Sequence, residues 1–156
     1  GVLALTNFGR TGDLVLPDGR MPSPKAQPQP EKGSVILVLA TDVPLEQRQL
    51  KRITRRCGAG LARLGAFWGH GSGDIAVGFS TAVTFDHDEP SDIVSFTALN
   101  ENCIDTLFRA ATESTQEAVL NSMCAAKAMR GRSGSRRSLA DWLRSAQDQS
   151  EMSDQN

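Results

Sequence analysis

The eight residues from Ser34 to Thr41 constrain the fold of this chain more than any other segment. They read Ser-Val-Ile-Leu-Val-Leu-Ala-Thr, so nearly every side chain is apolar and favours a β-strand. A strand that is apolar at successive positions, and not only at every second one, is typical of a strand covered on both faces. The sequence therefore predicts a buried strand over 34–41 with a core built around it.

A segment that cannot pack precedes this strand. Residues 20–33 hold four prolines and no large aliphatic side chain after Met21, which predicts an extended, solvated linker that stops at Gly33-Ser34. Upstream, two short apolar runs at 2–8 and 13–16 are joined by Gly-Arg-Thr-Gly. This spacing predicts a β-hairpin within 1–19.

Length and composition predict one folded domain with a real core. The 156 residues are 39% hydrophobic and 22% charged, with a net charge of −1, so the chain is not of the disordered class. The charge gives no sign of a nucleic-acid or membrane partner, and no apolar run reaches the length of a membrane span. The N-terminus has no Met and no signal peptide, so we expect that the beginning of the protein is missing and that its location is cytoplasmic.

Beyond the central strand, the apolar spacing predicts alternating helices and strands. A helix is expected from about Leu45 to Leu64 with Asp42 as N-cap, then a strand over 75–81. A long helix follows from Asn100 or Asn102 and ends at Gly131, and a short helix begins after Ser138. The three cysteines are expected to be buried free thiols. The chain then divides into 1–19 (hairpin), 20–33 (linker), 34–145 (main body) and 146–156 (polar tail).

The junction Gly33-Ser34 carries the first chemical signal. If the Ser34 hydroxyl attacks the Gly33 carbonyl, the resulting ester hydrolyses and Ser34 is left with a free α-amine. That amine, with an ordinary pKa of about 8, can act as general base for the hydroxyl of the same residue. Taken alone, the pair is equally compatible with an ordinary passage from loop to strand.

Two further polar groups accompany this junction. Ser72 and Asp74 stand two apart in a glycine-rich stretch, where they would share one side of a strand and the carboxylate could orient the hydroxyl. Asn7 ends the first apolar run, and a side-chain amide there can donate to a developing oxyanion. A glycine loop with a polar cap and an Asn in a turn are the plain structural alternatives.

A serine–histidine–aspartate triad is a weaker interpretation. The pattern Gly-x-Ser-x-Gly fails at Ser72 because His70 occupies the first glycine position. His70 is expected at the rim of the site, and His87 in a solvated acidic loop.

Together, Asn7-Phe8-Gly9, the Pro-rich linker, Gly33-Ser34, Gly71-Ser72-Gly73-Asp74 and Phe79-Ser80-Thr81 resemble one family. This is the L-aminopeptidase/D-esterase–amidase family of self-processing N-terminal-nucleophile hydrolases, which includes the β-peptidyl aminopeptidases. The resemblance runs from residue 1 to about 145. It implies an α+β sandwich of two sheets between helix layers, here incomplete. It also implies a serine protease-type hydrolase that removes the N-terminal residue from peptides, amides or esters.

The resemblance assigns roles to individual residues. Ser34 would be the autoproteolysis residue at the Gly33–Ser34 cleavage site and the nucleophile, Ser72 and Asp74 would assist it, and Asn7 would supply the oxyanion-hole amide. No cofactor or metal is implied. The expected partners are peptide or amide substrates, the missing N-terminal α-fragment and further copies in a homo-oligomer. The alternatives are an inactive or truncated remnant that serves as a binding or assembly subunit, and a related acyltransferase or oligoamide hydrolase, although those favour Thr at the cleavage point.

Overall fold

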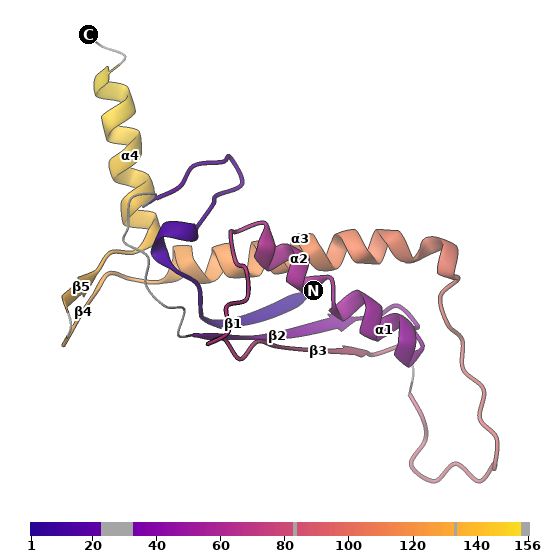
Figure 1. The fold of residues 1–156 in the computed structure, drawn as a ribbon. Helices are drawn as coiled ribbons and strands as arrows, with labels where there is room; N and C mark the ends of the chain where they lie inside the picture. The colour runs from indigo at the N-terminus through magenta and orange to yellow at the C-terminus, as the bar shows by residue number, and fades with distance from the viewer. Residues whose placement is uncertain (23–32, 83, 133, 154–156) are drawn as a thin grey trace. The chain divides into compact units, whose positions relative to one another are not determined.

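The computed structural model describes residues 1–22, 33–82, 84–132 and 134–153, and it divides into two compact units (Figure 1). The first unit comprises Gly1–Ala118 and the second Val119–Asn156. The linker prediction falls largely on residues 23–32, which lie outside the described residues. No helix in the described ranges is long and apolar enough to cross a membrane.

A three-stranded sheet in the order β1-β2-β3 forms the centre of the first unit. Strand β1 (Val2–Asn7) pairs antiparallel with β2 (Ser34–Thr41), and β2 pairs parallel with β3 (Ile75–Ser80). The apolar run that dominates the sequence is therefore the central strand, where both edges have partners. The predictions of strands over 34–41 and 75–81 are confirmed.

The predicted hairpin within 1–19 is wrong. Residues 13–16 form no strand, and Thr11–Asp13 is a short 3-10 turn, η1, that the Arg10–Asp13 ion pair closes at 2.5 Å. Strand β1 pairs with β2 instead, over the six positions from Val2↔Leu39 to Asn7↔Ser34. The run 13–16 is four residues long and ends at a proline, so it could form fewer backbone hydrogen bonds with β1 than the eight-residue strand β2 does.

The helix expected from Leu45 to Leu64 is two helices, α1 (Gln47–Thr54) and α2 (Cys57–Ala62). The break falls at two arginines, where the N–H of Arg56 bonds the carbonyl of Ile53 in a tighter i→i−3 turn. The N-cap is Glu46 and not Asp42, because the N–H of Glu46 donates to the Gln49 side chain at 3.2 Å.

The long helix α3 spans Ile104–Ala125 and does not reach Gly131. It follows a 3-10 turn, η2 (Glu101–Cys103), where the Asn100 side chain accepts from the N–H of Asn102 at 3.0 Å. One stripe of α3 is buried, and its members are Ile104, Ala111, Thr112, Thr115 and Val119. Cys103 and Cys124 lie off this stripe and are exposed, so only Cys57 is the buried free thiol that the sequence predicts.

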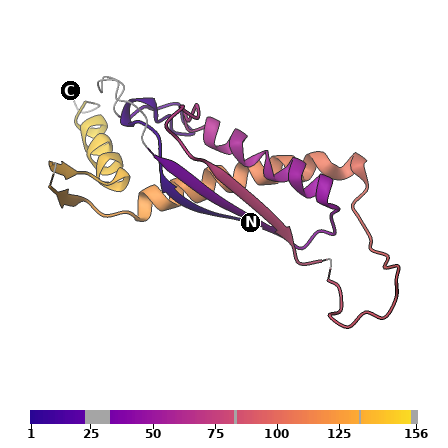
Figure 2. The same cartoon turned by 60° about the horizontal axis from the view of Figure 1, so that its bottom comes forward.

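The helices cover one face of the sheet, as Figures 1 and 2 show. Val35, Leu37 and Leu39 of β2 point towards them and are at most 4% exposed. The β3 backbone approaches α1 so closely that a Cβ at Gly78 would lie 2.2 Å from Oγ1 of Thr54. Strand β2 is thus covered on one face within the described residues, and not on both as the sequence predicts.

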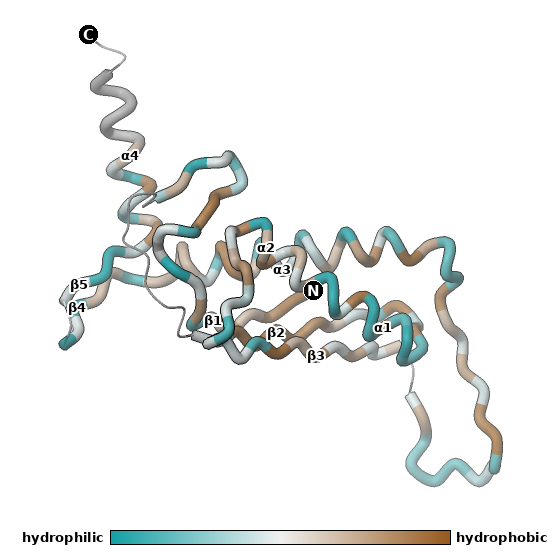
Figure 3. The backbone as a smooth tube through the Cα atoms, in the orientation of Figure 1, coloured by the Kyte–Doolittle hydropathy of each residue, from teal (hydrophilic) through white to brown (hydrophobic). Residues whose placement is uncertain are grey.

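The opposite face of the sheet is apolar and open. The strands are mostly hydrophobic along their length (Figure 3). The residues of this open sheet face are at least 41% exposed: Leu3, Leu5, Ile36, Ile75, Val77 and Phe79. They share one face because Leu5 pairs with Ile36, and Ile36 with Ile75, in the sheet register.

The second unit contains the end of α3, a two-stranded hairpin and a last helix. Strands β4 (Met129–Gly131) and β5 (Gly134–Arg136) pair antiparallel across the basic stretch that the sequence presents as flexible. Helix α4 (Leu139–Ser153) begins at the predicted cap, since the Ser138 hydroxyl accepts from the N–H of Asp141 at 3.0 Å. Because this hydroxyl also bonds the Asp141 carboxylate, the pKa of that carboxyl lies below its usual value. The helix continues into the predicted polar tail.

Candidate active site

Ser34 lies at the first position of β2, directly opposite Asn7 at the last position of β1. Opposite residues in an antiparallel pair project from the same face of the sheet. Both side chains are exposed, and both lie at one end of the open sheet face. The hydroxyl and the amide that the sequence singles out are therefore neighbours.

The residue before Ser34 has no room for a side chain. A Cβ at Gly33 would lie 2.0 Å from the carbonyl oxygen of Asn7 and 2.6 Å from Cα of Phe8. Any other residue would force the backbone of one strand away from the other. Glycine is thus required by the close approach of the β1 end to the Gly33–Ser34 peptide bond.

A glycine-rich turn brings Gly73 to the Ser34 hydroxyl. The N–H of Ser72 bonds the carbonyl of Gly69 at 2.9 Å, which closes the turn just before β3. From this turn the N–H of Gly73 donates to Oγ of Ser34 at 3.2 Å. A hydrogen-bond donor at this oxygen favours the alkoxide character that a nucleophile develops.

Ser72 and Asp74 are in contact, but not because a strand aligns them. Both precede β3, and the hydroxyl of Ser72 donates to Oδ1 of Asp74 at 2.6 Å. The same oxygen accepts from the N–H of Val35 at 3.1 Å. The strand alternation used in the sequence prediction is wrong for these residues. The turn and the parallel β2–β3 pairing bring the two side chains together and place them beside the start of β2.

Two backbone donors of this site have no signature in the sequence. The N–H groups of Gly73 and Val35 could be found only once β3 is known to lie parallel to β2. A Cβ at Gly73 would lie 3.3 Å from the Ser34 hydroxyl, so glycine at this position allows the close approach of the two segments.

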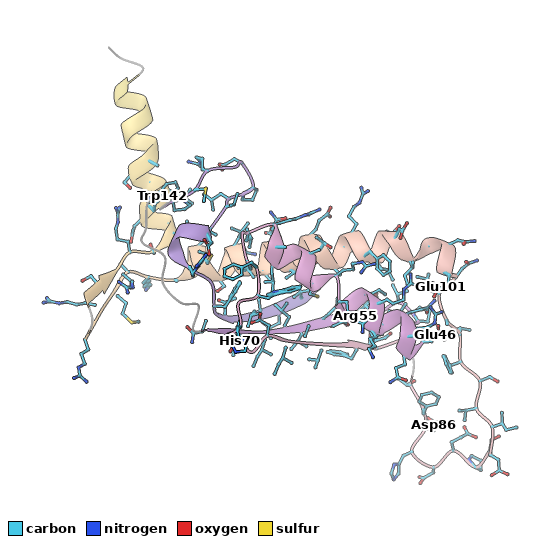
Figure 4. The ribbon with its side chains drawn as sticks, in the orientation of Figure 1. Glu46, Arg55, His70, Asp86, Glu101 and Trp142 are labelled. Carbon is cyan, nitrogen blue, oxygen red and sulfur yellow. The ribbon has the colours of Figure 1, made fainter. Side chains whose placement is uncertain are left out.

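The two histidines do not form a triad with Ser34 in the described structure. His70 is exposed in the turn before β3 (Figure 4), and His87 is exposed in the following loop. Among the described residues, Ser34 accepts from Gly73, and Asp74 accepts from Ser72 and Val35, so the bonds shown at the site involve neither histidine. Within the described ranges, no three His, Cys, Asp or Glu side chains lie close enough to hold a metal ion.

The fold matches those of solved structures. A protein from Pyrococcus horikoshii superposes with a TM-score of 0.72 at 37% identity, over 92% of this chain and 41% of that one. The L-aminopeptidase D-Ala-esterase/amidase of Ochrobactrum anthropi, described as a variant of the Ntn hydrolase fold, superposes with a TM-score of 0.73 at 28% identity. That match covers 97% of this chain and 48% of that one. The β-aminopeptidase of a Burkholderia species shares the fold at 22% identity and a TM-score of 0.66, over 93% of this chain and 49% of that one. These likenesses define the class, an α+β fold of the N-terminal-nucleophile hydrolase type, and confirm the predicted fold class.

The family follows from the sequence comparison. The model of peptidase family S58 matches residues 1–137, and the chain belongs to this family. It is 39% identical over 105 residues to a β-peptidyl aminopeptidase of Sphingosinicella microcystinivorans and 33% identical over 109 residues to one of Sphingosinicella xenopeptidilytica. Those matches cover 67% and 69% of this chain, but only 26% and 27% of the relatives. The chain therefore spans about a quarter of their length.

Proposed function

We propose that this chain carries the self-cleavage site and nucleophile of a serine aminopeptidase, with Ser34 in both roles. The observation that carries the proposal is the contact between the Gly73 N–H and Oγ of Ser34, at the end of a strand preceded by an obligatory glycine. Membership of a peptidase family supports reading this hydroxyl as the nucleophile of an amide-bond hydrolysis.

Self-cleavage would proceed by acyl transfer within the backbone. The Ser34 hydroxyl oxygen bonds to the Gly33 carbonyl carbon, its proton passes to the Ser34 nitrogen, and the Gly33–Ser34 C–N bond breaks to give an ester. Water then hydrolyses the ester, which leaves a carboxylate on Gly33 and a free amine on Ser34. Asn7, opposite Ser34 in the sheet, is the candidate amide donor to the oxyanion formed on the Gly33 carbonyl.

After cleavage the same hydroxyl would attack a substrate. The free amine of Ser34 would act as general base, and Ser72 and Asp74 would orient the strand end and relay hydrogen bonds around it. The relatives are named as β-peptidyl aminopeptidases and as an L-aminopeptidase D-Ala-esterase/amidase. By analogy, the substrates proposed here are peptides, amides or esters that lose their N-terminal residue.

The proposal includes a partner for the open sheet face. An α-fragment that precedes Gly1 would pack on the face formed by Leu3, Leu5 and the exposed residues of β2 and β3. Homo-oligomers of the cleaved pair and a cytoplasmic location are further parts of this proposal.

The first experiment follows the Gly33–Ser34 bond. The purified chain is incubated, and intact-mass spectrometry is expected to show two fragments separated at this bond. Ser34→Ala is expected to remain whole, because no hydroxyl is available to attack. Ser91→Ala is a suitable control, since Ser91 lies in the exposed loop that follows β3, where it bonds Glu89 and Ile93.

A wild-type chain that stays whole as long as Ser34→Ala would contradict self-cleavage in this chain. Hydrolysis of an aminoacyl p-nitroanilide by the cleaved chain, together with its α-fragment, would then distinguish an aminopeptidase from an inactive assembly subunit. Transfer of the aminoacyl group to an added amine in preference to water would favour the acyltransferase alternative.

A further inference from the structure

The segment that delivers Gly73 to the nucleophile contains an unfavourable backbone conformation. Trp68 has φ of 55°, and it is the non-glycine residue with positive φ in the described part of the chain. Side chains with a bulky Cβ substituent rarely adopt this left-handed region, at a cost of roughly 1–3 kcal/mol. Such a conformation persists where the surrounding contacts determine it, and it is enriched at functional sites.

The indole ring of Trp68 fits against a backbone notch in α2. A Cβ at Gly58 would lie 2.2 Å from Cη2 and 2.4 Å from Cζ2 of this ring. The ring edge therefore occupies the space that a side chain at position 58 would need. The residue as a whole is 52% exposed, so this one-sided fit to the helix, and not full burial, holds the indole in place.

The residues just before Trp68 are anchored to the segment that follows Asn7. A Cβ at Gly65 would lie 1.8 Å from the carbonyl oxygen of Asp13, and the N–H of Val15 bonds the carbonyl of Leu64 at 3.2 Å. In addition, the Arg10 guanidinium lies over the Phe67 ring, 4.8 Å from its centre. These contacts fix the chain up to position 67.

The residues just after Trp68 have little intrinsic preference for one backbone conformation, because three of them are glycines. Positions 69, 71 and 73 are glycines, and the turn is closed by the Ser72–Gly69 hydrogen bond. At the end of this turn, Gly73 and Asp74 bond Ser34 and Val35 at the start of β2. Trp68 is thus an anchored residue directly before a turn whose glycines permit many backbone conformations.

We infer that Trp68 is a positioning residue for Ser34: its indole in the Gly58 notch and its left-handed backbone orient the glycine turn so that the Gly73 N–H reaches the nucleophile. The consequence for cleavage rests on the proposed function. The consequence for the hydrogen bond between the Gly73 N–H and Oγ of Ser34 does not depend on the proposed function.

The first test compares three variants with a matched control in the same helix. Trp68→Phe keeps a flat ring, Trp68→Asn tolerates left-handed backbone but has no ring, and Gly58→Ala fills the notch. Gly60→Ala places the same methyl group two residues further along α2, against Thr112 and Thr115 of α3 and away from the indole. It lowers stability without touching Trp68.

The rate of Gly33–Ser34 cleavage is measured at a temperature where all four variants are folded. Trp68→Asn and Gly58→Ala should slow cleavage by about tenfold or more, because small displacements of reacting groups cost this much or more. Trp68→Phe should stay within about threefold of the wild type, since its ring still occupies part of the notch. A Gly58→Ala rate equal to that of Gly60→Ala would show that general destabilisation explains the effect and would overturn the inference.

The second test does not depend on activity. The Gly73 amide resonance and its hydrogen exchange are followed by NMR in each variant, with Ser34→Ala as the reference for an amide that has lost its acceptor. Trp68→Asn and Gly58→Ala should move the amide towards this reference and speed its exchange, whether or not the wild type cleaves itself. An amide that is unchanged in both variants would overturn the inference even if cleavage were slow.

Discussion

At the scale of single residues, Asp74 joins the two parts of the site through one oxygen. Its Oδ1 accepts from the Ser72 hydroxyl at 2.6 Å and from the Val35 N–H at 3.1 Å. Val35 is only 1% exposed with the carboxylate in place, so its N–H loses its acceptor if the carboxylate is removed. The acceptor is therefore a requirement of the fold as well as of the proposed chemistry.

The substitution Asp74→Ala should destabilise the chain by about 1–3 kcal/mol, because it leaves a buried backbone donor without a partner. Asp74→Asn should cost less than about 1 kcal/mol, since its amide oxygen can accept from both donors. Urea unfolding curves measure both, with Asp86→Ala in the exposed loop as a control for loss of a surface carboxylate. Equal losses for the Ala and Asn variants would show that the negative charge, and not the acceptor, is what β2 needs.

The sequence singles out four candidate residues that the structure brings to the start of β2, but it does not reveal their contacts. Asn7, Ser34, Ser72 and Asp74 stand at predicted strand ends or beside glycines, and it is the resemblance to a known family that singles them out together. The Asn7–Ser34 pairing depends on the register of two strands separated by the linker, which no local pattern reveals. The catalytic roles of these four residues stay predictions.

At the scale of secondary-structure elements, glycines determine how closely α2 approaches its neighbours. A Cβ at Gly60 would lie 2.5 Å from the Thr112 carbonyl and 2.7 Å from Cβ of Thr115, so α2 and α3 touch backbone to backbone. At the start of α1, Arg48 bridges Glu46 and Glu101 of η2 at 2.5 and 2.7 Å, and Figure 4 labels both glutamates there. Because Arg48 bonds Glu101, the pKa of the Glu101 carboxyl lies below its usual value.

Gly60→Ala should therefore destabilise the chain, although the same change in an exposed helix usually stabilises it by about 0.5–1 kcal/mol. The expected loss is about 1–3 kcal/mol, because the methyl group overpacks a contact that the backbone itself makes. Thermal unfolding measures the effect, and Gly131→Ala is the control, since its added Cβ would have only one neighbour, at 3.9 Å. A Gly60→Ala variant as stable as the wild type would mean that α2 and α3 can separate at little cost.

The type of an element could be predicted where a periodic apolar pattern extends over many residues. The boundaries of the elements could not be predicted in this way. The spacing of Leu50, Ile53, Cys57 and Leu61 is continuous across Arg55 and Arg56, so it predicts one helix where the backbone tightens into two. The end of α3 at Ala125 was missed for a different reason. Gly131 has the composition of a helix cap, but β4 pairs with β5 and takes this glycine into a hairpin.

At the scale of the whole molecule, the sheet is half covered. Its inner face buries Val35, Leu37 and Leu39 beneath the helices, whereas the opposite face leaves Leu3 71% and Leu5 69% exposed. A contiguous apolar face of this kind marks an interaction surface in a soluble protein. The sequence shows it as the near-absence of alternation in β2, which is typical of a strand with neighbours above and below.

If the proposed α-fragment covers this face, the energetic cost of a polar substitution there must depend on whether the fragment is present. In the chain described here Val77→Thr should leave stability nearly unchanged, because the side chain is already 51% exposed. In the longer protein the same change should cost about 1–2 kcal/mol, since a hydroxyl then replaces a methyl group in a buried apolar environment. Leu37→Ala, on the helix-covered face, is the matched control and should cost about 2–5 kcal/mol in both contexts. Urea unfolding of the two proteins supplies the comparison. Equal costs of Val77→Thr in the short and long forms would mean that something other than the α-fragment covers the open sheet face.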